Sequence, residues 1–283
     1  MLLLPARMVV LAAITYLSRA WRPVTPSVLE SARRLSIGAA PKMTTVLPAE
    51  PRLLLVSSGL TTPSLEASFH RMIRCVSPDA AEPKIAMLVT ASMCGSSSDG
   101  SSKRSPGELR RRRWADARKK GRDIETQLGV PVECIDCARE DLPAERYMKP
   151  LATAECIWVS GGNTFYLWHW MKRSGVDELI KRRVREDGIV YVGQSAGAIV
   201  AGETVRTAFW KGWDDPAAAP DEDWTDEANQ QAMGLAPVSL FPHYDAELWR
   251  NLVDSKRGEV HGRVLCLTDD GEESYVNGDV KNM

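Results

Sequence analysis

Short runs of apolar residues recur along the chain and end in small polar residues or in glycine. Strands of a parallel sheet produce such continuous runs, because helices cover both faces of the sheet. The pattern predicts strands at 51–58, 84–90, 131–135, 155–160, 188–192 and 264–267.

Between these runs lie longer segments that are typical of helices, at 64–75, 108–128, 164–173 and 176–186. Strand and helix therefore alternate along the chain. This alternation favours an α/β fold with a three-layer, doubly wound, mostly parallel sheet and helices on both faces.

The first 43 residues differ from the rest in composition. Six basic residues stand there against one acid, Glu30, and they are Arg7, Arg19, Arg22, Arg33, Arg34 and Lys42. Such a segment is typical of an organelle transit peptide, with a secretory signal or translation starting at Met43 as alternatives. We expect 1–43 to be a transit peptide or disordered leader and 44–283 to be a single α/β domain. The location would be a mitochondrion or plastid if the leader is real, and otherwise the cytoplasm.

The charges are nearly balanced, at 36 basic against 37 acidic residues and a net charge of −1. We therefore expect no nucleic-acid and no membrane partner. The basic run at 110–122 is interpreted as the solvated face of a helix rather than as a phosphate or RNA site. Six scattered cysteines fit a reduced compartment better than a disulfide framework. The Cys134-x-x-Cys137 pair lies in a strand-like alternation, which favours a structural over a redox or zinc role.

The segment Gly193-Gln194-Ser195-Ala196-Gly197 fits the pattern Gly-x-Ser-x-Gly, in which a serine nucleophile sits on a sharp strand-to-helix turn. An apolar strand precedes it, and an alanine-rich segment that could open a helix follows it. The start of a helix favours a negatively charged oxygen through its free amides and dipole. Ser195 is therefore the candidate nucleophile, and a chance match within a tight turn is the alternative.

A serine hydroxyl needs a base, and the chain has four histidines. His70 and His169 lie in predicted helices, and His261 precedes a predicted strand. His243 follows an apolar run in Leu-Phe-Pro-His-Tyr-Asp, where an α/β sheet often carries catalytic groups. His243 is therefore the favoured base.

A second glycine-rich segment, Ser160-Gly161-Gly162-Asn163-Thr164, also joins a strand to a helix. Two glycines allow the backbone to approach a substrate closely, so an amide here could form half of an oxyanion hole. The alternative is a plain tight turn with Asn163 or Thr164 as the helix N-cap.

Together, Gly-Gly-Asn-Thr-Phe, Gly-x-Ser-Ala-Gly-Ala and Pro-His-Tyr resemble, in this order, the motifs of peptidase E, the α-aspartyl dipeptidases of serine peptidase family S51. Cyanophycinase is a more distant relative with the same turn. The resemblance covers about residues 51–280. It implies a fold similar to the class I glutamine amidotransferases (flavodoxin-like) and hydrolysis of dipeptides with an N-terminal aspartate, without metal or cofactor.

The resemblance also implies residue roles. Ser195 would be the nucleophile and His243 the base, and Gly162 and Ala196 would supply oxyanion-hole amides. The third member of the triad stays open among Asp214, Asp215 and Asp270. A pocket selective for aspartate also needs a cation and a hydrogen-bond donor, for which Arg206 and Asn163 are the candidates, with a structural role as the favoured alternative for Arg206.

The predicted partner is thus a small peptide substrate, and the sequence leaves the oligomeric state open. Two other functions remain as alternatives. One is a cyanophycinase-like or amidase hydrolase on the same fold, and the other is a non-catalytic binding protein that has kept the fold.

Overall fold

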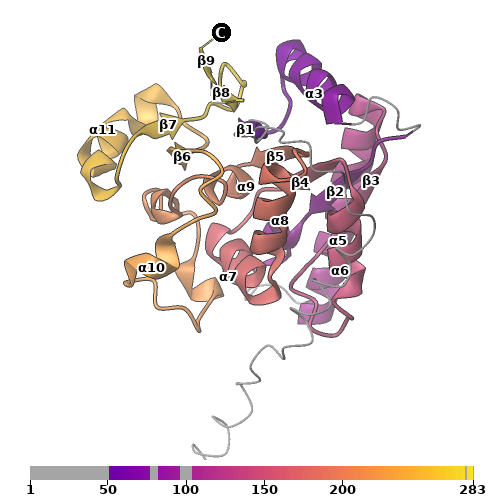
Figure 1. The fold of residues 1–283 in the computed structure, drawn as a ribbon. Coiled ribbons are helices and arrows are strands. Elements are labelled where there is room, and N and C mark those ends of the chain that lie inside the picture. The colour runs from indigo at the N-terminus through magenta and orange to yellow at the C-terminus, as the bar shows by residue number, and fades with distance from the viewer. Residues whose placement is uncertain (1–50, 77–81, 96–103, 278, 283) are drawn as a thin grey trace, which may run out of the picture. The chain divides into compact units, whose positions relative to one another are not determined.

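The computed structural model describes residues 51–76, 82–95, 104–277 and 279–282 (Figure 1). The predicted leader at 1–43 lies outside these residues, so the transit peptide and the cellular location stay predictions. The predicted division into a leader and one domain at 44–283 is likewise not decided by the described residues.

Nine strands and a series of helices alternate along the described chain. The strands are β1 Arg52–Val56, β2 Ile85–Leu88, β3 Val132–Ile135, β4 Cys156–Val159, β5 Val190–Gln194, β6 Ser239–Phe241, β7 Val264–Cys266, β8 Glu273–Val276 and β9 Asp279–Asn282. The α-helices are α3 Pro63–Val76, α4 Thr90–Met93, α5 Pro106–Leu128, α6 Glu145–Thr153, α7 Thr164–Ser174, α8 Val176–Arg185, α9 Ala196–Ile199, α10 Glu227–Gln230 and α11 Ala246–Lys256. Short 3-10 turns, η2 Arg206–Phe209, η3 Pro216–Ala218 and η4 Arg257–Glu259, join the later elements.

Seven of the strands form one sheet in the order β3-β2-β4-β5-β1-β8-β9. The pairings among β1 to β5 are parallel, whereas β8 pairs antiparallel with β1 and β9 antiparallel with β8. Strands β6 and β7 form a separate, parallel pair. Because β5 lies between β4 and β1, the chain ends of three parallel strands meet at one edge of the sheet.

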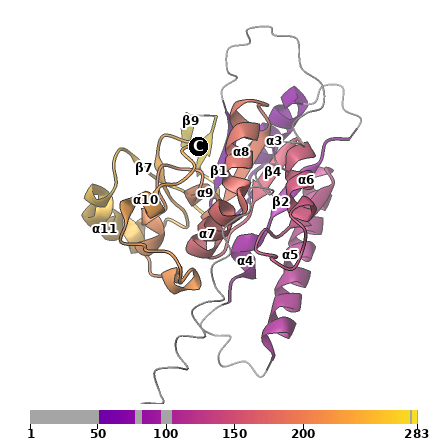
Figure 2. The ribbon, with the colours of Figure 1, turned by 60° about the horizontal axis from the view of Figure 1, so that its bottom comes forward.

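Helices cover both faces of the sheet (Figure 2). The apolar side chains of α3 and α5 pack with one set of strand residues, and those of α6, α7, α8 and α9 pack with the alternate set. This separation follows from the alternation of side chains along a strand. The expected α/β fold with a mostly parallel sheet and helices on both sides is confirmed.

The longest helix, α5, has sequence signals at both of its ends. The Ser105 hydroxyl accepts the backbone N–H of Glu108 at 3.3 Å, and the Glu108 carboxylate accepts that of Ser105 at 2.8 Å. This reciprocal capping starts the helix, and Gly129, with φ 65°, ends it. The buried face of α5 consists of Ala117, Gly121, Ile124 and Leu128.

Several short elements were not predicted from the sequence. Strands β6, β8 and β9 have three or four residues each, and helix α6 has nine. Strand β7 lies within the predicted strand 264–267, but it pairs with β6 and not with the main sheet. Such short segments carry too few residues for a clear period in the sequence.

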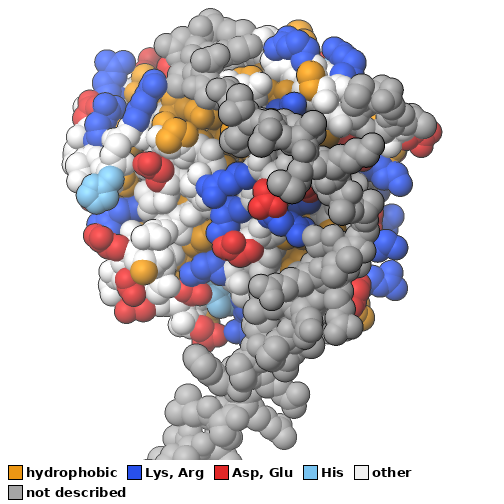
Figure 3. Space-filling view, viewed as in Figure 1, with side chains coloured by type: hydrophobic (Ala, Val, Ile, Leu, Met, Phe, Trp, Pro, Cys, Tyr) orange, Lys and Arg blue, Asp and Glu red, His pale blue; other side chains and the backbone are white. Residues whose placement is uncertain are grey.

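On the face shown in Figure 3, basic and acidic side chains lie intermixed, as expected for a nearly neutral chain. Among the described residues, no helix combines the length and the apolar character that crossing a membrane requires.

The contact of α9 with β4 depends on a glycine. A Cβ atom at Gly197 would lie 2.0 Å from the backbone oxygen of Val159, so Gly197→Ala must push the helix off the sheet. We expect this variant to lose about 1–3 kcal/mol of unfolding free energy, as in other overpacked cores. Thermal or urea denaturation measures the change.

The matched control is Gly258→Ala, since no atom lies within 4 Å of a Cβ at this position. Its stability should stay within about 0.5 kcal/mol of that of the unchanged protein. Equal stability of the two variants would contradict the close approach of α9 to β4.

Candidate active site

Three turns follow the neighbouring strands β4, β5 and β1 at the same edge of the sheet. In the sheet register, Val159 of β4 lies beside Gly193 of β5, and Val56 of β1 lies beside Gln194. The glycine turn after β4, Ser195 after β5 and Ser57 after β1 therefore come together, although they are far apart in the sequence.

Ser195 has a backbone conformation that is rare for a residue with a side chain, with φ 52° and ψ −112°. Its backbone N–H donates to the backbone oxygen of Val56 at 3.0 Å, and its backbone carbonyl oxygen accepts the N–H groups of Ala198 and Ile199. These bonds tie the strained residue to β1 on one side and to α9 on the other. Such strain is common at functional sites and persists only where the surroundings impose it.

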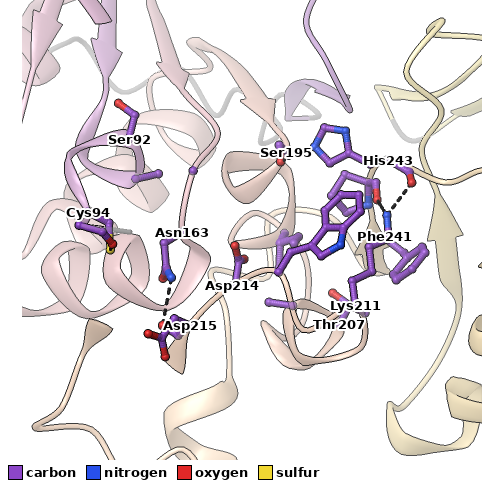
Figure 4. Close-up of a pocket in the computed structure, with 17 residues that line it drawn as sticks. Ser92, Cys94, Asn163, Ser195, Thr207, Lys211, Asp214, Asp215, Phe241 and His243 are labelled. Carbon is purple, nitrogen blue, oxygen red and sulfur yellow. Dashed lines mark hydrogen bonds between the residues drawn. The ribbon is translucent and has the colours of Figure 1, made fainter. Parts of the chain in front are cut away.

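The Ser195 side chain lies beside the His243 ring (Figure 4), and these two groups begin a row of three polar groups that Asp269 completes. Its Oγ lies 2.8 Å from Nε2 of His243, and Nδ1 of the same ring lies 2.6 Å from Oδ1 of Asp269. The His243 side chain is 28% exposed and the Asp269 side chain 59%, so the row is open to solvent at the carboxylate end. A hydroxyl, an imidazole and a carboxylate in this order form the arrangement that activates a serine.

Two serines at the end of β1 hold the carboxylate and the imidazole in place. Ser57 and Ser58 donate to Oδ1 of Asp269 at 2.5 and 2.6 Å. The Ser57 oxygen also accepts the backbone N–H of His243 at 2.7 Å, and His243 has a positive φ of 55°. Burial works to raise the pKa of Asp269, but the bonds from Ser57, Ser58 and His243 outweigh it and lower this pKa.

The small sheet β6–β7 carries both His243 and Asp269. The two strands are parallel, so the segments that follow them leave from the same end. The backbone N–H of Leu267 donates to the backbone oxygen of Phe241, and the N–H of Tyr244 donates to the backbone oxygen of Leu267, each at 2.9 Å. These bonds continue the pairing beyond the strands and bring the two side chains together.

The acid beside His243 corrects the choice made from the sequence. The expected candidates are Asp214, Asp215 and Asp270, and none of their carboxylates bonds to His243, whereas Asp269 does. Asp270 follows Asp269 directly, but its carboxylate accepts the backbone N–H two residues further on, at 3.0 Å. Its side chain therefore stabilises the turn and does not orient the imidazole.

The other two candidate acids lie across the site from Asp269. The Asp214 carboxylate accepts the backbone N–H of Thr164 at 3.1 Å. Burial raises the pKa of Asp214, and its electrostatic interaction with His243 works in the opposite direction. Asp215 accepts the side-chain N–H of Asn163 at its backbone oxygen and caps η3 with its carboxylate.

The predicted oxyanion-hole residues lie next to the serine. Gly162 has φ 142°, and a Cβ atom there would lie 2.3 Å from the backbone of Ala91, so only glycine fits. At Gly161, a Cβ would lie 2.9 Å from that of Ser195. Ala196 is the first residue of α9, where a backbone N–H has no acceptor within its own helix. Gly162 thus lines the same cavity as Ser195, and Ala196 follows Ser195 directly in the chain.

A cavity of about 460 Å³ opens beside Ser195 and His243. Asn163 lines it, but its side chain caps α7 by accepting the N–H of Tyr166 at 2.8 Å and donates to the backbone of Asp215. Both the oxygen and the nitrogen of the Asn163 side-chain amide thus form hydrogen bonds within the cavity wall.

Arg206, the candidate cation for substrate binding, does not line this cavity, which agrees with the structural alternative for this residue. Its guanidinium donates to the side chain of Gln230 at 3.1 Å and lies 3.6 Å from the carboxylate of Glu259. These contacts belong to a separate depression, so Arg206 has a structural environment in the fold.

The lysine that lines the cavity is Lys211, which the sequence analysis did not name. Its ammonium donates to the backbone oxygens of Pro242 and His243, at 2.7 and 2.5 Å. It also lies 4.4–4.9 Å from three aromatic rings, those of Phe241, Trp213 and Trp249. Burial lowers the pKa of Lys211 to about 8. This cation therefore fixes the backbone at His243 and places positive charge at the cavity wall.

Other candidate groups have structural partners. His169 lies 3.1 Å from the Glu222 carboxylate in the core, away from Ser195. Burial raises the pKa of Cys137 to about 12, and neither Cys134 nor Cys137 forms a disulfide. Within the described part of the chain, no group of three or more histidine, cysteine or acidic side chains is placed to hold a metal ion.

Comparison with known proteins identifies the family. The model of peptidase family S51 matches residues 110–281, which is more than half of the chain. This chain belongs to that family.

Curated relatives agree with this assignment. An uncharacterized peptidase of Listeria monocytogenes is 30% identical over 143 residues, 50% of this chain and 65% of that protein. Peptidase E of Shewanella amazonensis is 40% identical over 91 residues, 32% of this chain and 34% of its own length. The matched stretches thus span less than two thirds of these relatives.

Among solved structures, a putative peptidase E protein from Listeria monocytogenes superimposes with a TM-score of 0.55 at 22% identity. The match covers 82% of this chain and 97% of the other. This likeness supports the fold.

The row of Ser195, His243 and Asp269 predicts how a serine-directed fluorophosphonate will react. The reagent should label Ser195, and His243→Gln or Asp269→Asn should slow labelling by at least about 100-fold, because the base or its orientation is lost. Intact-mass spectrometry over time measures the rate.

Asp270→Asn is the matched control, since this carboxylate bonds only within its own turn among the described groups. It should be labelled at the rate of the unchanged protein. A larger effect at Asp270 than at Asp269 would refute the assignment of the acid.

Proposed function

We propose that this protein is a serine peptidase that hydrolyses dipeptides with an N-terminal aspartate through an acyl-enzyme. The observation that carries the proposal is the hydrogen-bonded row of Ser195, His243 and Asp269 at the edge of a small cavity. Membership in peptidase family S51 supports the peptide substrate.

In the proposed mechanism, Nε2 of His243 takes the proton of the Ser195 hydroxyl as its oxygen attacks the scissile carbonyl carbon. Nδ1–H of the same ring donates to Asp269, which fixes the tautomer and stabilises the imidazolium. The imidazolium then gives its proton to the departing amine. A water molecule, deprotonated by the same histidine, releases the acyl group and restores the serine.

The negative oxygen of the tetrahedral intermediate needs donors that are already in place. The backbone N–H groups of Gly162 and Ala196 supply them in this proposal, because Gly162 lines the cavity beside Ser195 and Ala196 opens α9 directly after it. Losing one such donor typically costs about 3 kcal/mol of transition-state stabilisation.

The cavity beside the serine suits the amino-terminal residue of the substrate. Asp214 and Asp215 line it and can attract an α-ammonium group, and Lys211 can attract a side-chain carboxylate. In this proposal, Lys211 and not Arg206 is the cation that binds the side-chain carboxylate of the substrate. A volume of about 460 Å³ favours a small substrate over a folded protein.

The purified chain should hydrolyse Asp-Leu at least about tenfold faster, as kcat/KM, than Ala-Leu, because a paired carboxylate is worth about 1.5–3 kcal/mol. Release of free leucine measures both rates. Ser195→Ala should lose nearly all activity.

Equal rates on both peptides would remove the aspartate specificity but keep the peptidase. Activity on β-linked aspartyl polymers or on simple amides instead would favour the cyanophycinase-like or amidase alternative. No Ser195-dependent turnover of any of these would favour a binding protein.

Lys211→Met tests the cation in the cavity. We expect the preference for Asp-Leu over Ala-Leu to fall by about tenfold or more, since the charge that attracts the side-chain carboxylate is gone. Because Lys211 also holds the backbone of His243, the rate on Ala-Leu should fall as well.

The ratio of the two rates separates these effects. Lys149→Met removes an exposed lysine and should leave the ratio unchanged. A Lys211→Met enzyme that is slower on both peptides by the same factor would leave Lys211 with a positioning role alone.

A further inference from the structure

A second cavity, of about 240 Å³, lies on the other side of the glycine turn, between the end of β4 and helix α5. Ser160 and Gly161 line it from the turn, and Lys120 and Arg113 line it from the helix. Ser92 lines both this cavity and the larger one beside Ser195. In Figure 4, Ser92 and His243 lie on opposite sides of Ser195.

Lys120 brings a positive charge into this second cavity. Burial lowers the pKa of Lys120, and no described carboxylate lies within ion-pair distance of its ammonium. Asp116, one turn earlier on α5, is 73% exposed and lies 4.0 Å from Arg112 instead. Asp116 also lines this cavity, so its lining carries two cations, Arg113 and Lys120, against one acid. A partly buried ammonium that no carboxylate pairs directly favours an anionic ligand.

Ser160 offers a second unused polar group at the same place. The residue is 2% exposed, and its Oγ has no hydrogen-bond partner in the described structure. Leaving a buried hydroxyl unpaired costs free energy, so the Ser160 hydroxyl calls for a partner. A hydroxyl and an ammonium that line one cavity match the two oxygens of a carboxylate.

The second cavity is also close to the reacting serine. Gly161 lines it, and a Cβ atom built on Gly161 would come within 2.9 Å of Cβ and 3.4 Å of Oγ of Ser195. In a dipeptide, the carbonyl carbon that is attacked and the terminal carboxyl carbon are three bonds apart, at most about 4 Å. A dipeptide bound at Ser195 therefore has its carboxylate within reach of this part of the turn.

We propose that Lys120 and Ser160 bind the C-terminal carboxylate of the substrate, which makes the site selective for dipeptides with a free carboxyl end. This inference rests on the proposed peptidase function and adds the recognition of the leaving residue. The ammonium of Lys120 pairs with the carboxylate, and the Ser160 hydroxyl donates to it.

The charges on the two sides of Ser195 fit this direction of binding. Asp214 and Asp215 line the larger cavity, where the α-ammonium of the substrate would lie, and Lys120 lines the smaller one. A dipeptide carries these same opposite charges at its two ends. A longer peptide would place an uncharged amide beside Lys120 and lose that pairing.

The test compares Asp-Leu with Asp-Leu-amide, which lacks the terminal charge. The unchanged enzyme should prefer the free acid by about 10- to 100-fold in kcat/KM, the usual worth of a hydrogen bond to a charged group. Lys120→Met should reduce this preference to about onefold through slower turnover of Asp-Leu, with Asp-Leu-amide unaffected. Lys119→Met, which removes the exposed neighbouring lysine, is the matched control and should keep the full preference.

Ser160→Ala gives a second test, in which substrate binding should weaken while the stability of the protein does not. Removing a buried, unpaired hydroxyl should leave the thermal stability of the free protein unchanged or raise it. The same variant should raise the KM for Asp-Leu several-fold. A merely structural serine would not separate these two effects.

Three outcomes overturn the inference while leaving the peptidase intact. The first is that Lys120→Met slows both substrates equally, and the second is that it leaves the preference for the free acid in place. The third is that it abolishes the preference for Asp-Leu over Ala-Leu. The last result would assign Lys120 to the aspartate side chain instead.

Binding to the inactive Ser195→Ala protein covers the case in which no turnover is found. Calorimetry should show the same preference for Asp-Leu over its amide, and Lys120→Met in the Ser195→Ala background should remove it. Selective binding without turnover would support the carboxylate site and refute the peptidase. Equal affinity for both ligands, or none for either, would refute the carboxylate site.

Discussion

The register of β5 between β4 and β1 is the constraint on which the rest of the site depends. The first four residues of β5, Val190 to Gly193, are paired on both sides, and Gln194 is paired with β1. This pairing fixes where the three following turns stand relative to one another. The hydrogen bond from Ser195 to Val56 continues the same ladder past the end of β5. A one-residue slip would reverse the direction of every side chain on the strand and take the serine out of line with its partners.

The local pattern of the sequence predicts the strands β1 to β5 and the helices α3, α5, α7 and α8, and it points to two residues of the row, but it misses the short elements β6, β8, β9 and α6. An apolar strand that runs into small residues indicates the turn at Ser195, and a strand end before His243 indicates a base. The choice between Asp269 and Asp270 depends on longer-range contacts. Both follow β7, and the first is selected by donors from Ser57 and Ser58, more than 200 residues earlier in the chain. No local period in the sequence carries that information.

The misplaced cation has a similar physical cause. Arg206 and Lys211 both lie in or beside the short turn η2, where side-chain directions follow no regular period. The aromatic rings of Phe241 and Trp249 come from later elements, and their contacts with the ammonium of Lys211 hold this lysine, and not Arg206, at the cavity.

The basic run on α5 shows the limit of a helical pattern. Its interpretation as a solvated face holds for exposed positions such as Lys119. It does not hold for the next residue, Lys120, which is partly buried. A helical pattern predicts the direction in which a side chain leaves the helix axis, but it does not predict whether another element of the fold buries that side chain. The residues Ser160 and Gly161, which arrive from β4, make the Lys120 position enclosed.

Ser195 follows a strand of the seven-stranded sheet, whereas His243 and Asp269 follow the two strands of the pair β6–β7. The hydrogen-bonded row of these three residues is thus completed only across a boundary inside the fold, where Ser57 is bonded to both His243 and Asp269. Small units of a protein can open locally at a much lower free energy than the whole molecule. The fraction of molecules in which the row is complete is therefore set by how firmly this minor sheet is docked. The row can come apart while the main sheet remains folded.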